Sequence, residues 1–252
     1  METGYVKVKT ENFISTIEFY HPASNSLPGI ILDQLSSVIT SLGTDEKTLV
    51  IILKSAGDRA FCAGASFDEL VAIDDGAAGK KFFSGFASVI NACRKCPKLI
   101  IGRVQGKAVG GGVGVASAVD YCYATKYAAV KLSELAVGIG PFVVGPAVER
   151  KIGNSAMSQL TINATEWKSA DWAAEKGLYA EIFETAQEMD TAIQNLATKL
   201  AASNPQAMRM LKEIFWQGTE HWDDLLAERA QMSGTLVLSD FTRNAINKFK
   251  SK

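Results

Sequence analysis

The sequence predicts an α/β fold, in which helices and strands alternate along the chain. Two continuous apolar runs, at residues 48–55 and 98–106, are typical of strands buried on both faces of a parallel sheet. A segment with apolar residues at helical spacing precedes each run, at residues 26–44 and 80–96. This repeated order of helix and buried strand indicates strands joined by helical crossovers.

The other elements follow from local patterns. Residues 5–21 alternate apolar and polar side chains around Asn12, which predicts a hairpin. The first helix is expected to end near Gly43, and residues 119–132 to form two short strands with a turn between them. A glycine-rich stretch at residues 104–120 leads from the second buried strand into a helical pattern.

The strands stop at about Gln187. Four helical segments follow, in which Asn204 and either Ser239 or Asp240 suit N-cap positions. We therefore expect a core of residues 1–190 and a helical region of residues 191–252. No low-complexity linker separates the two, so the helices should pack on the core or on a neighbouring subunit.

Composition excludes several classes of protein. The 252 residues are 47% hydrophobic and 9% aromatic, as in ordinary globular proteins. The net charge of −1 gives no bulk attraction to nucleic acid or to an anionic membrane. The first residues lack the apolar segment of a signal peptide, and no apolar run approaches the roughly 18 residues of a membrane span. We expect a cytoplasmic protein with no nucleic-acid or membrane partner.

Neither the cysteines nor the histidines predict a metal site. Cys93 and Cys96 form a C-x-x-C pair, but a metal site would need further ligands, and His21 and His221 are far apart. We expect reduced thiols near a helix end. A serine protease arrangement of Ser66 or Ser117 with a histidine has no G-x-S-x-G motif to support it.

Two strand–loop–helix junctions, at residues 59–70 and 104–120, are rich in small residues. At such junctions, backbone N–H groups point outward without a partner, and the helix dipole adds positive potential. Two converging N–H groups can form an oxyanion hole, which needs close approach rather than side chains. The glycines therefore either allow close packing or make the backbone itself the functional group.

Glu134 is the candidate proton carrier. Its neighbours Leu132, Leu135, Ala136 and Val137 are apolar, and desolvation among them would raise the pKa of the carboxyl group towards neutrality. The alternative is an exposed glutamate on a loop.

Three segments together resemble the crotonase superfamily, the enoyl-CoA hydratase/isomerase family. They are "FCAGASFDEL", "GKAVGGGVGVASAVDYCYAT" and "KLSELAVGIGP", in this order, and the resemblance extends over almost the whole chain. It implies a spiral of ββα units with a C-terminal helical region. It also implies a homo-oligomer, either a trimer or a dimer of trimers, in which residues 191–252 serve oligomerisation.

The resemblance assigns roles to single residues. The backbone N–H groups of Ala65 and Gly111 would bind the thioester oxygen of an acyl-CoA and stabilise an enolate, and Glu134 would move the proton. No cofactor is implied, because coenzyme A is part of the substrate. The positions that match coenzyme A contacts are Asn25, Ser26, Leu27, Ala60, Phe61, Ala63, Gly110, Phe249 and Lys252.

The sequence departs from the standard hydratase at one position. That enzyme adds water with two glutamates; the second matches Glu134, but the first matches Gly114. One glutamate suffices for double-bond isomerisation, and "ELAVGIGPF" is similar to the mitochondrial-type Δ3,Δ2-enoyl-CoA isomerases. Isomerisation is therefore favoured. The alternatives are a hydratase, including the methylglutaconyl-CoA type, that uses another carboxylate such as Asp68 or Glu69, and a non-catalytic protein that binds coenzyme A.

Overall fold

The computed structural model describes residues 3–250, apart from the side chains of Phe249 and Lys250. Within these residues the main sheet has the strand order β1-β2-β4-β7-β9-β11. Its strands are β1 (Tyr5–Glu11), β2 (Ile14–Tyr20), β4 (Val50–Ser55), β7 (Leu99–Val104), β9 (Tyr121–Thr125) and β11 (Glu181–Phe183). The β1–β2 pair is antiparallel, and the later pairs are parallel. The predicted α/β class is confirmed.

Two smaller sheets lie at the ends of the main strands. The first has the order β10-β8-β5, and the second pairs β3 with β6. Their strands are β3 (Ser26–Leu27), β5 (Ala60–Cys62), β6 (Gly64–Ala65), β8 (Lys107–Val109) and β10 (Val130–Lys131). The two strands predicted within residues 119–132 are β9 and β10, and they belong to different sheets. The small sheets hold the two glycine-containing junctions close together.

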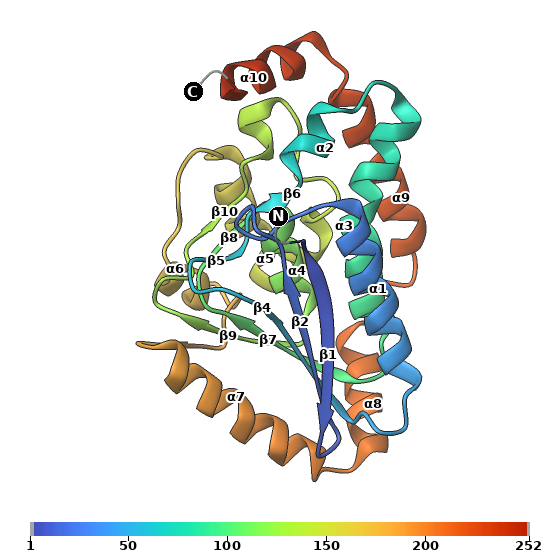
Figure 1. Ribbon diagram of the computed structural model, residues 1–252, viewed down its shortest axis with the longest axis vertical. Helices are drawn as coiled ribbons and strands as arrows, with labels where there is room; N and C mark the ends of the chain where they lie inside the picture. The colour runs from blue at the N-terminus through green and yellow to red at the C-terminus, as the bar shows by residue number, and fades with distance from the viewer. Residues whose placement is uncertain (1–2, 251–252) are drawn as a thin grey trace.

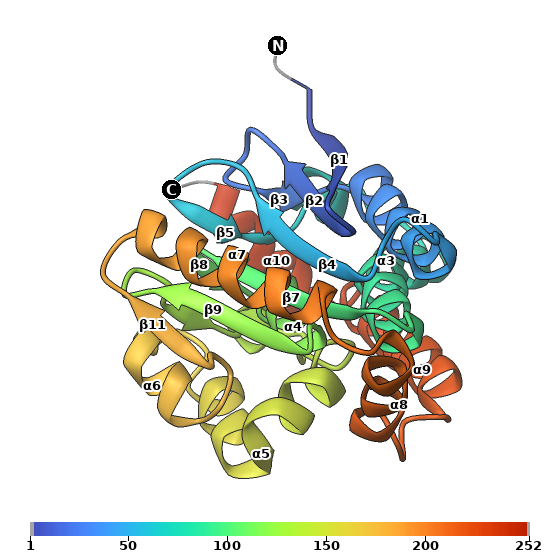
Figure 2. The same cartoon turned by 90° about the horizontal axis from the view of Figure 1, so that it is seen from below.

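Helices cover both faces of the main sheet. One face packs against α1 (Gly29–Thr44), α3 (Gly76–Lys95) and α4 (Gly111–Ala118), whose buried side chains form the large core. The opposite face is covered by α7 (Ala186–Ala201), which crosses β4, β7 and β9 (Figure 2). Met189 and Ile193 of α7 form a second core with Ile52 and Ile101 of the sheet. Because both faces are covered, the central strands β4 and β7 are mostly apolar.

The remaining helices surround this core. They are α2 (Phe67–Val71), α5 (Gly145–Ile162), α6 (Ala170–Glu175), α8 (Pro205–Phe215), α9 (Trp222–Leu236) and α10 (Asp240–Lys250), with the 3-10 helix η1 (Glu134–Val137). Figure 1 shows α10 beside α2, at the end of the molecule opposite α7 and α8. The predicted division at residue 190 falls within α7, and a role of residues 191–252 in assembly stays a prediction.

Local signals in the sequence are borne out at several element ends. Asn12 and Phe13 turn the β1–β2 hairpin with φ angles of 50° and 64°. The Asn204 side chain accepts hydrogen bonds from the first turn of α8, as expected of an N-cap. The Ser239 hydroxyl accepts one from the Thr242 N–H at the start of α10.

Asp120 joins the C-terminal helices to the sheet. Its carboxylate accepts hydrogen bonds from the Ile100 N–H, from Lys212 Nζ at 2.6 Å and from Trp216 Nε1 at 3.0 Å. The Asp120 and Lys212 side chains are 5% and 2% exposed. A buried charge is tolerated only with such partners, so the role of Asp120 is structural.

The cysteines, the helices and the metal-ligating side chains of residues 3–250 can be compared with what the sequence predicts. All four cysteines are free and buried, and burial raises the pKa of Cys62, Cys93 and Cys122 to about 12. No helix in residues 3–250 combines the length and apolar character that crossing a membrane requires. The same residues contain no group of three or more histidine, cysteine or carboxylate side chains placed to hold a metal ion.

Candidate active site

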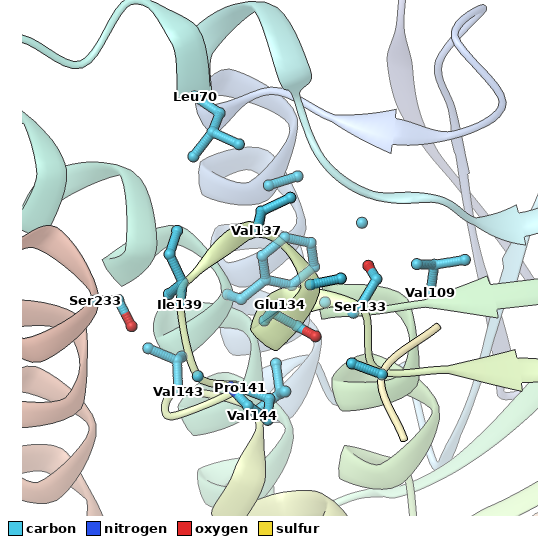
Figure 3. Close-up of a pocket in the computed structure, with 18 of the residues that line it drawn as sticks. Leu70, Val109, Ser133, Glu134, Val137, Ile139, Pro141, Val143, Val144 and Ser233 are labelled. Atoms are coloured by element: carbon cyan, nitrogen blue, oxygen red, sulfur yellow. The ribbon is translucent and has the colours of Figure 1, made fainter. Parts of the chain in front are cut away.

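A cavity of about 500 Å³ lies where β6, α4, η1 and α3 meet. Figure 3 shows Glu134 in its middle, with Val109 and Ser133 on one side and Ile139, Val143 and Ser233 on the other. Much of the wall is apolar, contributed by Leu70, Phe82, Phe83, Phe86, Val137 and Val144. A mostly apolar cavity with a few polar groups is the usual form of a small-molecule site.

The two backbone donors predicted from the sequence both lie on this cavity. Ala65 is in β6, and Gly111 is the first residue of α4, where an N–H has no acceptor within the helix. The two junctions are close, since a Cβ atom added to Gly64 would lie 3.9 Å from the Gly111 nitrogen. Beside Ala65, the Ser66 N–H donates to the Leu27 carbonyl and the Ser26 hydroxyl donates to the Ala65 carbonyl, which fixes the strand.

The glycines are required because other groups lie against the backbone. Gly110 has a φ of +52°, and a Cβ there would be 2.9 Å from Glu134 Oε1. A Cβ on Gly111 would be 2.2 Å from the Phe86 ring. Side chains at either position would displace the carboxylate or the ring, so only glycine brings this backbone to the cavity wall.

Glu134 begins η1, and its carboxyl group is largely removed from water. The residue as a whole is partly exposed, but Oε2 is buried and has no hydrogen-bond partner among the described residues. Burial raises the pKa of Glu134 to about 7, and a hydrogen bond from its own backbone N–H opposes the rise. The carboxyl group can therefore accept and return a proton near neutral pH, as a general base must. The alternative of an exposed loop glutamate is wrong.

No second carboxylate of residues 3–250 lines the cavity. Asp68 and Glu69 are exposed and do not line it, and Glu69 instead accepts a hydrogen bond from the Gly29 N–H at 2.9 Å. Gly114 is buried in α4 away from the lining, and a Cβ there would be 2.5 Å from Val144 Cγ1. Within the described part of the chain, Glu134 is the one acidic residue that lines the cavity.

The residues matched to coenzyme A contacts fall into four groups. Ser26 of β3 and Ala60 of β5 are half-buried and do not line the cavity. Ala63 and Gly110 line the cavity. The side chains of Leu27 and Phe61 are in the core, and Asn25 is buried and donates to the Ala56 and Ala60 carbonyls. Lys252 and the side chain of Phe249 lie outside the described residues. Contact between these positions and coenzyme A stays a prediction.

Several cavity residues could not be predicted from the sequence. Phe82, Phe83 and Phe86 belong to the helical pattern at residues 80–96, whose apolar face could have been assigned to a cavity wall as well as to the core. Val144 and Trp167 carry no local signal, because only the folded chain brings them to Gly114 and to Lys131.

Thr242 of α10 holds the turn that carries Glu134. Its buried hydroxyl donates to the carbonyl of Gly138, which directly follows η1, at 3.3 Å. Gly138 has a φ of +84°, and a Cβ there would be 2.7 Å from Thr242 Oγ1. The C-terminal helix is therefore in direct contact with the segment that positions the carboxylate.

We expect Thr242→Val to lower kcat about threefold to tenfold, the effect of losing one hydrogen bond of roughly 0.5–1.5 kcal/mol. Looser packing of η1 admits water to Glu134, so the midpoint of the pH–rate profile should move below that of the wild type. Thr242→Ser keeps the hydroxyl and should restore both quantities. Identical pH–rate profiles for the valine variant and the wild type would rule out this role.

Glu134→Gln should also change how stability depends on pH. The folded pKa of Glu134 is about 7 and the ordinary value 4.5, so the folded protein binds more protons between these pH values. Stability is therefore lost as pH rises from 4.5 to about 7. The variant should be more stable than the wild type at pH about 8, by at most about 3 kcal/mol, and equal to it near pH 4.

Chemical denaturation of both proteins at the two pH values measures this difference. Glu228→Gln, at an exposed position of α9, is the control and should show no such dependence. A wild-type protein that is no less stable than Glu134→Gln at the higher pH would show that the carboxylate is solvated.

The chain matches the family model described as "Enoyl-CoA hydratase/isomerase" over residues 9–252. It is 28% identical to the short-chain-enoyl-CoA hydratase of Clostridium acetobutylicum, over 100% of this chain and 97% of the relative. It is 32% identical to the mitochondrial methylglutaconyl-CoA hydratase of Mus musculus, over 78% of this chain and 63% of that one. The crystal structure of enoyl-CoA hydratase from Bacillus halodurans superposes with a TM-score of 0.89 at 20% identity, covering 97% of this chain and 99% of that one.

Proposed function

The chain belongs to the enoyl-CoA hydratase/isomerase family, and on this premise we propose that it shifts a double bond along the acyl chain of an enoyl-CoA. The expected crotonase fold is confirmed by the solved structures that it resembles. The observation that carries the proposal is the single carboxylate, Glu134, in a cavity that also presents the backbone of Ala65 and Gly111.

The reaction follows from these three residues. The thioester oxygen of a 3-enoyl-CoA accepts hydrogen bonds from the N–H groups of Ala65 and Gly111. Ionised Glu134 removes a proton from C2, and the electrons of the C–H bond spread into a dienolate whose negative charge the two donors stabilise. Glu134 then returns the proton to C4, which leaves the double bond between C2 and C3 and regenerates the carboxylate.

Hydration needs one group more than the cavity supplies. One group must hold and deprotonate the water while another protonates the α carbon. Val144 occupies the space beside Gly114 where the side chain of a second glutamate would start, and Asp68 and Glu69 face elsewhere. These contacts support isomerisation over the two-carboxylate addition of water.

The lining favours an uncharged acyl chain. Lys131 is the one basic side chain that lines the cavity in the described residues, and its ammonium group lies 4.5 Å from the Trp167 ring centroid. No neighbouring charge contributes to the raised pKa of Glu134, so this ammonium does not act on the catalytic carboxyl group. A second carboxylate on the acyl chain, as in a glutaconyl group, would lose its hydration wherever it lay against the phenylalanines of the wall.

Incubation with 3-enoyl- and 2-enoyl-CoA thioesters tests the function. We expect the 3-enoyl-CoA to become a 2-enoyl-CoA with no change of mass, detected by its absorbance and by mass spectrometry. Addition of water to a 2-enoyl-CoA at about 1–1,000 per second, a typical enzymatic rate, would make the protein a hydratase. Binding of coenzyme A with no turnover would make it a non-catalytic binder.

The cytoplasmic location remains a prediction. We also propose that the chain associates with copies of itself. The side chains of Met210, Leu211, Ile214 and Phe215 on α8 are 45–55% exposed and form an apolar surface. Apolar surface of this kind is typical of an interface between subunits. Light scattering after size exclusion should give the mass of a trimer or a hexamer, whereas the 27.0 kDa of a single chain would contradict the proposal.

A further inference from the structure

A second cavity, of about 350 Å³, adjoins the catalytic cavity around Glu134. The two cavities share the residues of one segment, which are Ile139, Gly140, Pro141 and Phe142. They also meet along α9, where Arg229 and Leu236 line the second cavity and Ser233, between them on the same helix face, lines the catalytic one. The cavities therefore lie side by side, with the shared segment as the boundary between them.

The second cavity offers mainly apolar surface. Gly153, with a φ of +76°, kinks α5 and brings Met157 close to Gly145, where an added Cβ would be 3.3 Å from Met157 Cε. The Thr161 hydroxyl donates to the Met157 carbonyl at 2.9 Å, so this polar group already has a partner. Glu149 is exposed and reaches solvent. The apolar side chains that line only this cavity are Leu135, Pro146, Met157 and Leu236. Such a lining suits a hydrocarbon chain.

Phe142 is the movable side chain of the boundary. Ile139 is only 2% exposed and is packed in a core cluster, Gly140 has no side chain, and the ring of Pro141 is fixed to the backbone. Phe142 is half-buried, and its ring lies against Gly140, where an added Cβ would be 2.5 Å from Phe142 Cε1. Removal of this ring would open a passage between the cavities without a change in the backbone.

The acyl chain of the proposed substrate extends towards this boundary. In the proposed reaction the thioester oxygen is at Gly111, and C2 to C4 lie beside Glu134. Figure 3 shows Val109, two residues before Gly111, on one side of the carboxylate, and Ile139 and Ser233 on the other. The carbons beyond C4 therefore continue towards Ile139, which belongs to the boundary.

We propose that Phe142 sets the length of the acyl chain by closing the passage between the two cavities. This inference rests on the proposed acyl-CoA substrate. With the ring in place, the acyl chain is confined to the catalytic cavity of about 500 Å³, which favours a short chain. A smaller side chain at position 142 adds the second cavity of about 350 Å³, where the distal carbons of a longer chain are removed from water.

Two substrates of different length test the passage. Each protein is assayed with 3-hexenoyl-CoA and with 3-dodecenoyl-CoA, and the measured quantity is the ratio of kcat/KM for the longer substrate to kcat/KM for the shorter one. The variant is Phe142→Ala. The matched control is Phe82→Ala, at another half-buried phenylalanine, which lines the catalytic cavity but not the second one. The control removes the same atoms from the wall without opening the passage.

We expect the wild type to favour the hexenoyl substrate and Phe142→Ala to raise the ratio about tenfold, the gain from burying roughly two further CH₂ groups. Phe142→Leu keeps part of the bulk and should raise the ratio less, and it replaces the alanine variant if that variant does not fold. Phe82→Ala should keep the ratio of the wild type. A wild-type preference for the dodecenoyl substrate, or equal gains in the two alanine variants, would overturn the proposal.

Filling the second cavity tests where the end of the longer chain lies. Leu236 is 38% exposed and lines the second cavity but not the catalytic one. A tryptophan there occupies part of the second cavity, so Phe142→Ala/Leu236→Trp should return the ratio to that of the wild type. If the gain of Phe142→Ala persists in the double variant, the chain end lies elsewhere and the proposal is wrong.

Direct binding separates this inference from the proposed reaction. Calorimetry with the saturated hexanoyl-CoA and dodecanoyl-CoA needs no turnover, so it gives a result even if no enoyl-CoA reacts. We expect Phe142→Ala to gain affinity for dodecanoyl-CoA and not for hexanoyl-CoA. Unchanged affinities in the folded variant would reject the role of Phe142 and leave the isomerase proposal standing. A gain for dodecanoyl-CoA without turnover of any enoyl-CoA would support the role of Phe142 and reject the isomerase proposal.

Discussion

Replacing Glu134 with glutamine is expected to lower kcat by about two to four orders of magnitude, the usual contribution of a general acid–base group. Glutamine has nearly the same shape and cannot accept the proton, so the fold and the affinity for coenzyme A should remain. Steady-state rates with a 3-enoyl-CoA measure the effect, and circular dichroism and calorimetry check the fold and the binding. Glu228→Gln is the matched control, because its carboxylate is exposed on α9.

The pH dependence of the wild type gives the same residue a second test. Since the reaction begins with ionised Glu134, whose pKa is about 7, the rate should rise with pH through a midpoint near that value. The residual activity of Glu134→Gln should lack this rise. Turnover of the variant within threefold of the wild type would remove Glu134 from the mechanism.

Replacing the backbone amide of Gly111 with an ester should lower the rate of the chemical step about 100- to 1,000-fold. The ester lacks the N–H that is proposed to bind the thioester oxygen, and loss of one such donor raises the barrier by about 2.7–4 kcal/mol. The Gly111 N–H is in the first turn of α4, where no helical bond depends on it. Folding should therefore be little affected.

An ester at Gly76 is the control for this change. Gly76 is also the first residue of a helix, α3, but it does not line the cavity. Both ester proteins should fold, and only the protein altered at Gly111 should lose activity in single-turnover measurements. Full activity of a folded Gly111 ester would show that the oxyanion is stabilised elsewhere.

The long elements were predictable because their patterns are local. The apolar runs that became β4 and β7 are buried on both faces, and the spacing in α1 and α3 shows which side is apolar. The short strands β5, β6 and β8 have two or three residues each, too few to show a period. Their positions depend on pairing with distant strands, which sequence periodicity does not report.

The candidate site was predictable to a similar degree. Glu134 and the glycines stand out in the sequence because a lone carboxylate among apolar residues and bare backbone are themselves chemical signals. Three contacts at the site join residues that are 30 or more positions apart, so no local pattern in the sequence marks them. They are Val144 with Gly114, Thr242 with Gly138, and Lys131 with Trp167. The contact of Val144 with Gly114 supports the proposal of a single carboxylate, which the sequence alone left open.

The central claim is that one carboxylate carries one proton from C2 to C4 of the substrate. It is tested most directly by converting a 3-enoyl-CoA whose C2 carries ordinary hydrogen in deuterated water and measuring the deuterium at C4 of the product. Because Glu134 Oε2 is buried, we predict that a measurable share of the first-turnover product retains the substrate's hydrogen at C4. Complete deuteration at C4 from the first turnover, or a product that has gained the mass of water, would contradict the account.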